Sequence, residues 1–374
     1  MVYWKKGSVF SRRIHMKYAS SLPCPLLFSP REDRYAPSIR KFQGCPTLAV
    51  TRGGRIYMGW YAGGSKEPHM ENYNLLIFSD DQGVTWSDPL LIIPSSKERC
   101  VHALDIQLWT APDGRLFVFW VQNNTRPYTP GAEGTVVDGF VFDDYTHAEW
   151  LVICDDPDAK APVFSAPRYL DQGFLRCKPT VLSNGAWLNF NYDQMNSRYG
   201  YSISCNQGQT YIRHYGAEKI ETPFDETMAY EKRDGSIRML ARCTKGELAQ
   251  SISRDGGVTW SEACLSGISS PSSRFFISRT PSGRILLIHN DHPEKRCNMT
   301  LCLSEDDGET WPYRRCIDSR IEISYPDADF YDGKIYFTYD RERTGAKEIL
   351  FGACTEEDIM DPSRPLPIRI ISKP

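Results

Sequence analysis

Residues 113–120 read DGRLFVFW, a turn-forming Asp-Gly pair followed by a run of apolar, largely aromatic residues. An x-Gly pair before such a run indicates a β-hairpin, because glycine readily adopts the positive φ of tight turns. The pattern occurs six times, and the glycine at the second position of its x-Gly pair is Gly54, Gly114, Gly185, Gly235, Gly283 or Gly333. These glycines lie 60, 71, 50, 48 and 50 residues apart, which is typical of one four-stranded sheet per repeat. The sequence therefore predicts an all-β fold, a six-bladed β-propeller.

A second repeat, Ser-x-Asp-x-Gly-x-Thr-Trp, is complete at residues 79–86, 253–260 and 304–311 and degraded at 204–211. Its Asp can bond turn amides, its Gly can take a positive φ and its Trp can pack between blades. The repeat resembles the Asp-box of sialidase-type propellers, which closes the hairpin between the third and fourth strands of a blade. Because that motif is structural, we expect its aspartates to support the fold: Asp81, Asp255 and Asp306.

The chain is expected to form one domain over residues 1–374. Its composition, with 41% hydrophobic and 24% charged residues, is that of a globular protein. Residues 1–35 form an N-terminal extension that we expect to close the ring against the last blade. Only Thr355–Asp358 suggest a helical turn.

Bulk properties argue against several classes of partner. A net charge of −3 provides no broad basic surface for nucleic acid, and no apolar run reaches the length of about 18 residues that a membrane span needs. The twelve cysteines show no metal-ligand spacing, so we expect mostly buried free thiols, no metal and no cofactor. The charged N-terminal segment does not resemble a signal peptide, which favours a cytoplasmic location.

The resemblance to the sialidase family extends to the residues that carry chemistry. Ser324-Tyr325-Pro326-Asp327 is similar to the family element that supplies a tyrosine nucleophile. Residues 224–230, followed by Arg242, are similar to the element that supplies its partner glutamate and one carboxylate-binding arginine. The resemblance implies that Glu226 is the base for Tyr325. A phenol, with an ordinary pKa near 10, needs such a base, and a neutral nucleophile suits a sugar bearing a carboxylate at or near its anomeric carbon.

The arginines follow the family pattern only in part. Arg296 occupies the place of a further carboxylate-binding arginine, and Arg274, beside two aromatic residues, is another candidate. The family carries Arg-Ile-Pro near the first blade, whereas residues 44–46 read Gly-Cys-Pro, with Gly44 in the place of the first arginine. Either Arg274 replaces it from another blade, or the substrate differs from ordinary sialic acid.

The general acid has no direct match. The family places an aspartate in the loop after the first-blade strand, and that loop here contains Glu67, His69 and Glu71. Either glutamate could protonate the leaving oxygen if burial raised its pKa, and His69 could do so without a shift.

Three more polar residues lie near the start of a blade and are candidate sugar contacts. They are Gln43, Asp105 and Lys178. In a propeller, residues far apart in the sequence converge at one mouth of the central channel.

Together these features predict an exo-acting glycoside hydrolase that removes a terminal acidic sugar from a glycan, with retention of configuration. Two alternatives stay open: a lyase acting on uronates, in which tyrosine or histidine abstracts a proton, and a carbohydrate-binding propeller without catalysis. The sequence determines neither the sugar and its linkage nor the oligomeric state.

Overall fold

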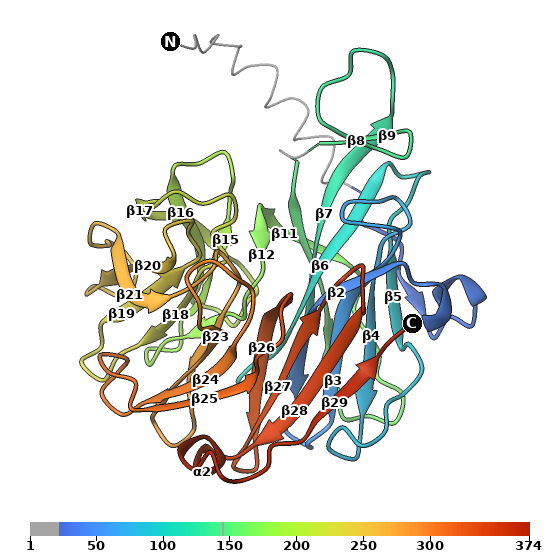
Figure 1. Ribbon diagram of the computed structural model, residues 1–374. Helices are drawn as coiled ribbons and strands as arrows, with labels where there is room; N and C mark the ends of the chain where they lie inside the picture. The colour runs from blue at the N-terminus through green and yellow to red at the C-terminus, as the bar shows by residue number, and fades with distance from the viewer. Residues whose placement is uncertain (1–21, 144–145) are drawn as a thin grey trace.

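The computed structural model describes residues 22–143 and 146–374 of the chain. Six antiparallel blades follow one another in chain order, and the inner strand of the first lies against the inner strand of the last (Figure 1). The predicted six-bladed propeller is therefore confirmed. Within the described residues the one α-helix is α2 (Glu356–Met360), which begins at a capping box formed by Thr355 and Asp358.

The first three blades contain the following strands. The first blade is β2 (Phe42–Val50), β3 (Ile56–Gly63), β4 (Tyr73–Ser79) and β5 (Leu91–Pro94), extended by β1 (Leu27–Phe28). The second is β6 (Val101–Thr110), β7 (Leu116–Pro127), β10 (Ala148–Cys154) and β11 (Arg168–Gln172), with a projecting hairpin of β8 (Thr135–Val137) and β9 (Phe140–Phe142). The third is β13 (Thr180–Val181), β14 (Trp187–Asn189), β16 (Arg198–Ser204) and β17 (Ile212–Glu218), beside the short pair β12 (Phe174–Leu175) and β15 (Asn191–Tyr192).

The last three blades are regular four-stranded sheets. The fourth is β18 (Met228–Glu231), β19 (Ile237–Ala241), β20 (Glu247–Ser253) and β21 (Cys264–Ser269). The fifth is β22 (Phe276–Arg279), β23 (Ile285–Asn290), β24 (Met299–Ser304) and β25 (Tyr313–Asp318). The sixth is β26 (Ile323–Tyr331), β27 (Lys334–Arg341), β28 (Glu348–Cys354) and β29 (Ile368–Ser372).

The six predicted x-Gly turns each join the first and second strands of one blade. The four Asp-box segments each lie between the third and fourth strands, as predicted. In the fourth blade, Asp255 Oδ1 accepts hydrogen bonds from Ser253 Oγ at 2.8 Å and from Thr259 N at 2.8 Å. The Asp-box aspartate therefore holds its own turn together.

Asp-box tryptophans pack between blades, which confirms the role expected for them. Trp86 of the first blade meets Phe351 of the sixth edge to face, with ring centroids 5.4 Å apart. Trp260 of the fourth blade lies 6.0 Å from Phe190 of the third. These contacts couple neighbouring sheets.

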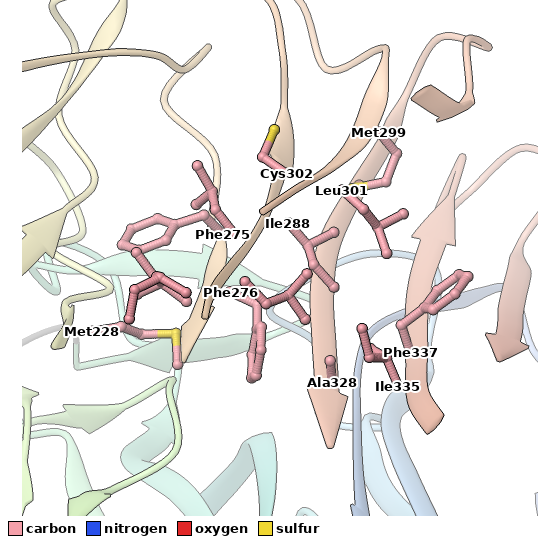
Figure 2. Close-up of a cluster of buried hydrophobic side chains, with 14 of the residues drawn as sticks. Met228, Phe275, Phe276, Ile288, Met299, Leu301, Cys302, Ala328, Ile335 and Phe337 are labelled. Carbon is pink, nitrogen blue, oxygen red and sulfur yellow. The ribbon is translucent and has the colours of Figure 1, made fainter. Parts of the chain in front are cut away.

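The largest buried cluster joins three adjacent blades (Figure 2). Met228 belongs to the fourth blade, Phe276 and Ile288 to the fifth, and Ala328 and Phe337 to the sixth. Burying each large apolar side chain stabilises the fold by about 1.5–3 kcal/mol. Side chains of neighbouring blades thus share one core and keep the inner strands fixed around the channel.

The described part of the N-terminal extension does not close the ring as expected. β1 pairs with β5, on the outer edge of the first blade, and the outer strand of the sixth blade is the C-terminal β29. Arg40 and Gln43 of the first blade bond Ser372 directly, so side chains bridge the two blades. Residues 1–21 lie outside the described residues.

All twelve cysteines are free and eight are buried, as expected. In the described part of the chain, no helix is long and apolar enough to cross a membrane.

Candidate active site

One residue from each blade occupies an equivalent place before the first hairpin. The residue nine positions before the turn glycine is Cys45, Asp105, Arg176, Glu226 or Arg274 in the first five blades. In the sixth blade Tyr325 stands eight positions before its glycine, because the turn between Tyr331 and Lys334 is shorter. These six residues come from six strands or strand entrances, and they include the predicted nucleophile Tyr325 and its predicted base Glu226.

Four of these residues have a left-handed backbone, which is uncommon for side chains other than glycine. The φ values are 55° for Cys45, 52° for Asp105, 42° for Glu226 and 58° for Tyr325. In β2, β6 and β26 the residue lies in a register shift of the strand pair. Bulges of this kind redirect a side chain and recur beside active sites.

The structure brings together the predicted nucleophile and its base. Tyr325 Oη donates a hydrogen bond of 2.6 Å to Glu226 Oε1, and both residues are buried. Arg242 Nη1 donates to Glu226 Oε2 at 2.9 Å and to Tyr325 Oη at 3.3 Å. Arg176 Nη2 lies 3.5 Å from Glu226 Oε1. One carboxylate therefore binds the phenol and two guanidinium groups.

These contacts separate the pKa values of the pair. Burial raises the pKa of Tyr325 to about 12, Glu226 adds to the rise, and the neighbouring arginines oppose it. Burial alone would raise the pKa of Glu226, but Arg242, Arg176 and the tyrosine hydrogen bond outweigh it and lower that pKa to about 2. At neutral pH the pair is thus a protonated phenol beside an ionised carboxylate, the state that a base-assisted nucleophile requires.

Four guanidinium groups surround the ring of Tyr325. Their central carbons lie 4.1 Å (Arg343), 4.9 Å (Arg176), 5.5 Å (Arg296) and 5.7 Å (Arg274) from the ring centroid. Such contacts between a cation and a ring are favourable. The predicted nucleophile is therefore surrounded by positive charge.

The arginines differ in their counter-charges. Arg176 pairs with Asp105, and Arg274 lies 3.7 Å from Asp327 and donates to the Pro326 carbonyl. Arg296 donates only to the Ser272 carbonyl, at 3.3 Å, and forms no ion pair with another described residue. Its charge is available to an anionic ligand.

Of the three candidate acids, only Glu67 reaches this cluster. Its Oε2 lies 3.6 Å from Arg343 Nη1, and its side chain is partly exposed. Glu71 is exposed to solvent. His69 faces the projecting hairpin, where its Nε2 is 3.7 Å from Asp138 Oδ2.

The three candidate sugar contacts lie in three different surroundings, and only one of them joins the candidate site. Asp105 joins the site through Arg176, and burial raises its pKa. Lys178 Nζ lies 3.5 Å from Asp327 and bonds the Leu48 carbonyl, so it is engaged between blades. Gln43 is turned away: its Oε1 accepts from Trp60 Nε1 at 3.0 Å and from Ser372 Oγ at 3.1 Å.

Two arginines of the site were not among the candidates from the sequence. Arg176 could have been found by its spacing, because it lies nine residues before Gly185 just as Glu226 lies nine before Gly235. Arg343 lies in the loop between β27 and β28 and has no such signal.

No group of three or more His, Cys, Asp or Glu within residues 22–143 and 146–374 has the geometry to hold a metal ion.

Comparisons with known proteins agree with this architecture. A family model described as a BNR repeat-like domain matches residues 54–336, well over half of the chain. No curated protein matches the chain.

Several solved structures share the fold at low identity. A protein of unknown function from Dyadobacter fermentans is 17% identical, with a TM-score of 0.63, over 87% of this chain and 95% of that one. The NanB sialidase of Streptococcus pneumoniae is 17% identical, with a TM-score of 0.64, over 88% and 69%. The leech intramolecular trans-sialidase is 14% identical, with a TM-score of 0.65, over 91% and 71%.

At such identities the likeness shows the fold alone, since one fold can host different functions. The family match covers all six turn glycines, together with Tyr325, Glu226 and the arginines of the fourth and fifth blades. The chain therefore belongs to the BNR repeat-like domain family, and it shares its six-bladed fold with solved sialidases.

Proposed function

We propose that this protein is a glycoside hydrolase that releases a terminal acidic sugar from a glycan, with Tyr325 as nucleophile and Glu226 as its base. The observation that carries the proposal is the 2.6 Å hydrogen bond from Tyr325 to Glu226 inside a group of guanidinium side chains. The sialidases among the structural neighbours support a sialic acid or a related sugar as the substrate class.

The chemistry follows from the protonation states. As Tyr325 Oη bonds to the anomeric carbon, its proton passes to Glu226 Oε1 and the bond to the leaving oxygen breaks. Before it attacks, the phenol is neutral, so a carboxylate on the sugar does not repel it as it would repel an aspartate. Arg242 bonds the reacting oxygen, Arg296 and Arg343 lie over the ring that carries it, and all three can bind that carboxylate.

The leaving oxygen requires a proton, and we assign its donor as Glu67, the one candidate acid that reaches the site. Ionised after this step, Glu67 then takes a proton from the water that cleaves the glycosyl-tyrosine bond. Glu226 returns its proton to Tyr325. Two displacements at one carbon give net retention of configuration.

The test is hydrolysis of aryl glycosides, with sialosides, uronides and neutral sugars in the panel, by the wild type and Tyr325→Phe. We expect an acidic glycoside to be cleaved and kcat to fall by about 10³-fold or more in Tyr325→Phe, because the nucleophilic oxygen is removed. Tyr230→Phe is a matched control: it also removes a buried hydroxyl, one that bonds the Asp307 carbonyl at 2.8 Å. It should retain activity.

The products distinguish the alternatives. The first anomer released, followed by nuclear magnetic resonance, should have the configuration of the substrate. An unsaturated product that absorbs in the ultraviolet would instead identify a uronate lyase. Bound but unaltered ligand after long incubation would identify a carbohydrate-binding propeller.

A further inference from the structure

We propose that Arg343 of the sixth blade supplies the anion-binding guanidinium that residue 44 of the first blade lacks, and that Gly44 is the residue that makes room for it. The inference rests on the proposed function, because it assigns a residue to the recognition of an acidic substrate. It makes recognition of the acid a property of the junction between the first and last blades.

The space beside Gly44 is filled by Arg343. A Cβ atom added to Gly44 would lie 2.7 Å from both Cγ and Cδ of Arg343 and 2.8 Å from its Nε. Real Cβ atoms do not approach other atoms so closely. The φ of Gly44 lies outside the left-handed region, so its backbone alone does not require glycine. The Arg343 side chain can occupy this space because Gly44 has no side chain.

The arginine is held at several points by these two blades. Its carbonyl accepts a hydrogen bond from Gln43 N at 3.0 Å, and its Nε donates to Asp340 Oδ2 at 2.9 Å. Asp340 is fully buried and is itself fixed by Cys45 N at 2.7 Å and by Ser324 Oγ at 2.7 Å. A guanidinium positioned in this way loses little entropy when it binds a ligand.

Its head lies next to the nucleophile and is partly accessible. The central carbon is 4.1 Å from the ring centroid of Tyr325, the shortest of the four such distances, and 18% of the side chain is exposed. Nη1 faces Glu67 at 3.6 Å, so the arginine lies between the proposed acid and the nucleophile. An anion beside Tyr325 can therefore bond Arg343 of the sixth blade and Arg296 of the fifth.

The other candidate replacement is less available. The side chain of Arg274 is 3% exposed and is engaged by the Pro326 carbonyl and by Asp327. Arg274 thus supports the strand that carries Tyr325, whereas Arg343 can contact the ligand.

The experiment measures binding instead of turnover. N-acetylneuraminic acid and its methyl ester are titrated into the wild type and Arg343→Met, with calorimetric detection. We expect the wild type to prefer the acid, and Arg343→Met to lose about 10- to 100-fold in affinity for the acid with little change for the ester. Arg341→Met is the matched control: among residues 22–143 and 146–374, Arg341 pairs only with Glu342 and Glu348, so its loss should leave both affinities unchanged.

Two further variants address the role of Gly44. Gly44→Ala should weaken binding of the acid, because its Cβ displaces Arg343. Arg343→Gly combined with Gly44→Arg should bind the acid more tightly than Arg343→Gly alone, because it returns a guanidinium to the same space. The thermal melting of each variant shows whether it is folded.

The outcomes separate this inference from the proposed function. Preference for the acid in the wild type that persists in folded Arg343→Met overturns the role of Arg343 and leaves the acidic substrate class intact. A wild type that does not distinguish the acid from the ester overturns both for this sugar.

Discussion

At the scale of the residue, Glu226 controls the state of Tyr325. Glu226 remains ionised at ordinary pH because its pKa is lowered to about 2, below the ordinary value near 4.5. A lowered pKa means that the ionised group contributes stability above pH of about 4.5, and that this contribution is lost as pH falls towards 2.

Replacing Glu226 by Gln tests this coupling through the tyrosine itself. The Glu226 carboxylate disfavours the phenolate, whereas Arg176, Arg242 and Arg343 favour it. Glu226→Gln should therefore lower the pKa of Tyr325 from about 12 towards its ordinary value near 10. The measurement is a titration of the ultraviolet tyrosinate band.

The titration needs a subtraction, because the chain has twenty tyrosines. The signal of Tyr325 is the difference between Glu226→Gln and the double variant Glu226→Gln/Tyr325→Phe. The same difference is measured between the wild type and Tyr325→Phe. Equal or higher pKa values in Glu226→Gln would contradict the electrostatic account of the pair.

At the scale of the element, most of the correct predictions from the sequence came from short motifs. Each x-Gly turn and each Asp-box is determined by residues within a few positions of one another. The six hairpins and the four Asp-box turns can therefore be predicted from the sequence. Tyr325, Glu226 and Arg242 stand at fixed places relative to those turns, and the structure brings them together.

What the sequence could not predict depends on distant contacts. Arg343 belongs to the site because the first and last blades meet, where Cys45 and Asp340 are bonded although they are 295 positions apart in the chain. The direction of Gln43 depends on Ser372 in the same way, at a separation of 329 positions. The orientation of the His69 side chain towards Asp138 likewise depends on the β8–β9 hairpin of the second blade.

Two turn glycines allow the contacts between blades to be measured apart from the local backbone. Gly83, in the Asp-box of the first blade, has φ 81°, and a Cβ there would lie 2.3 Å from the ring of Phe351 in the sixth blade. Gly235, with φ 80°, has nothing within 4 Å of such a Cβ. Both substitutions by alanine incur the left-handed cost of about 1–2 kcal/mol.

Only Gly83→Ala also overpacks a junction between blades, which costs about 1–3 kcal/mol more. We expect Gly83→Ala to lower the midpoint of urea unfolding clearly more than Gly235→Ala. Equal midpoints would show that Phe351 and its surroundings can move to accommodate the added Cβ without loss of stability.

At the scale of the whole molecule, one buried carboxylate, that of Asp327, contacts residues of most of the blades. Asp327 Oδ2 accepts hydrogen bonds from Thr47 Oγ1 at 2.6 Å in the first blade and from Gln107 Nε2 at 3.3 Å in the second. Lys178, at the entrance to the third blade, lies 3.5 Å away, and Arg274, at the entrance to the fifth, lies 3.7 Å away. Asp327 itself belongs to the sixth, two residues after Tyr325, so the same strand connects the blades and carries the proposed nucleophile.

Removing this carboxylate should loosen the ring as a whole. Asp327→Ala leaves Arg274 buried without its counter-charge and leaves Lys178 only the Asp329 carboxylate at 3.8 Å; breaking a buried ion pair in this way costs about 3–5 kcal/mol. Asp327→Asn keeps the shape and one acceptor and should cost less. In Asp318→Ala, the matched control, the partner Arg320 is 42% exposed and can be solvated, so a smaller loss is expected. Urea unfolding followed by tryptophan fluorescence measures all three, and a midpoint for Asp327→Ala equal to that of Asp318→Ala would mean that apolar packing between blades, and not this carboxylate, holds the ring.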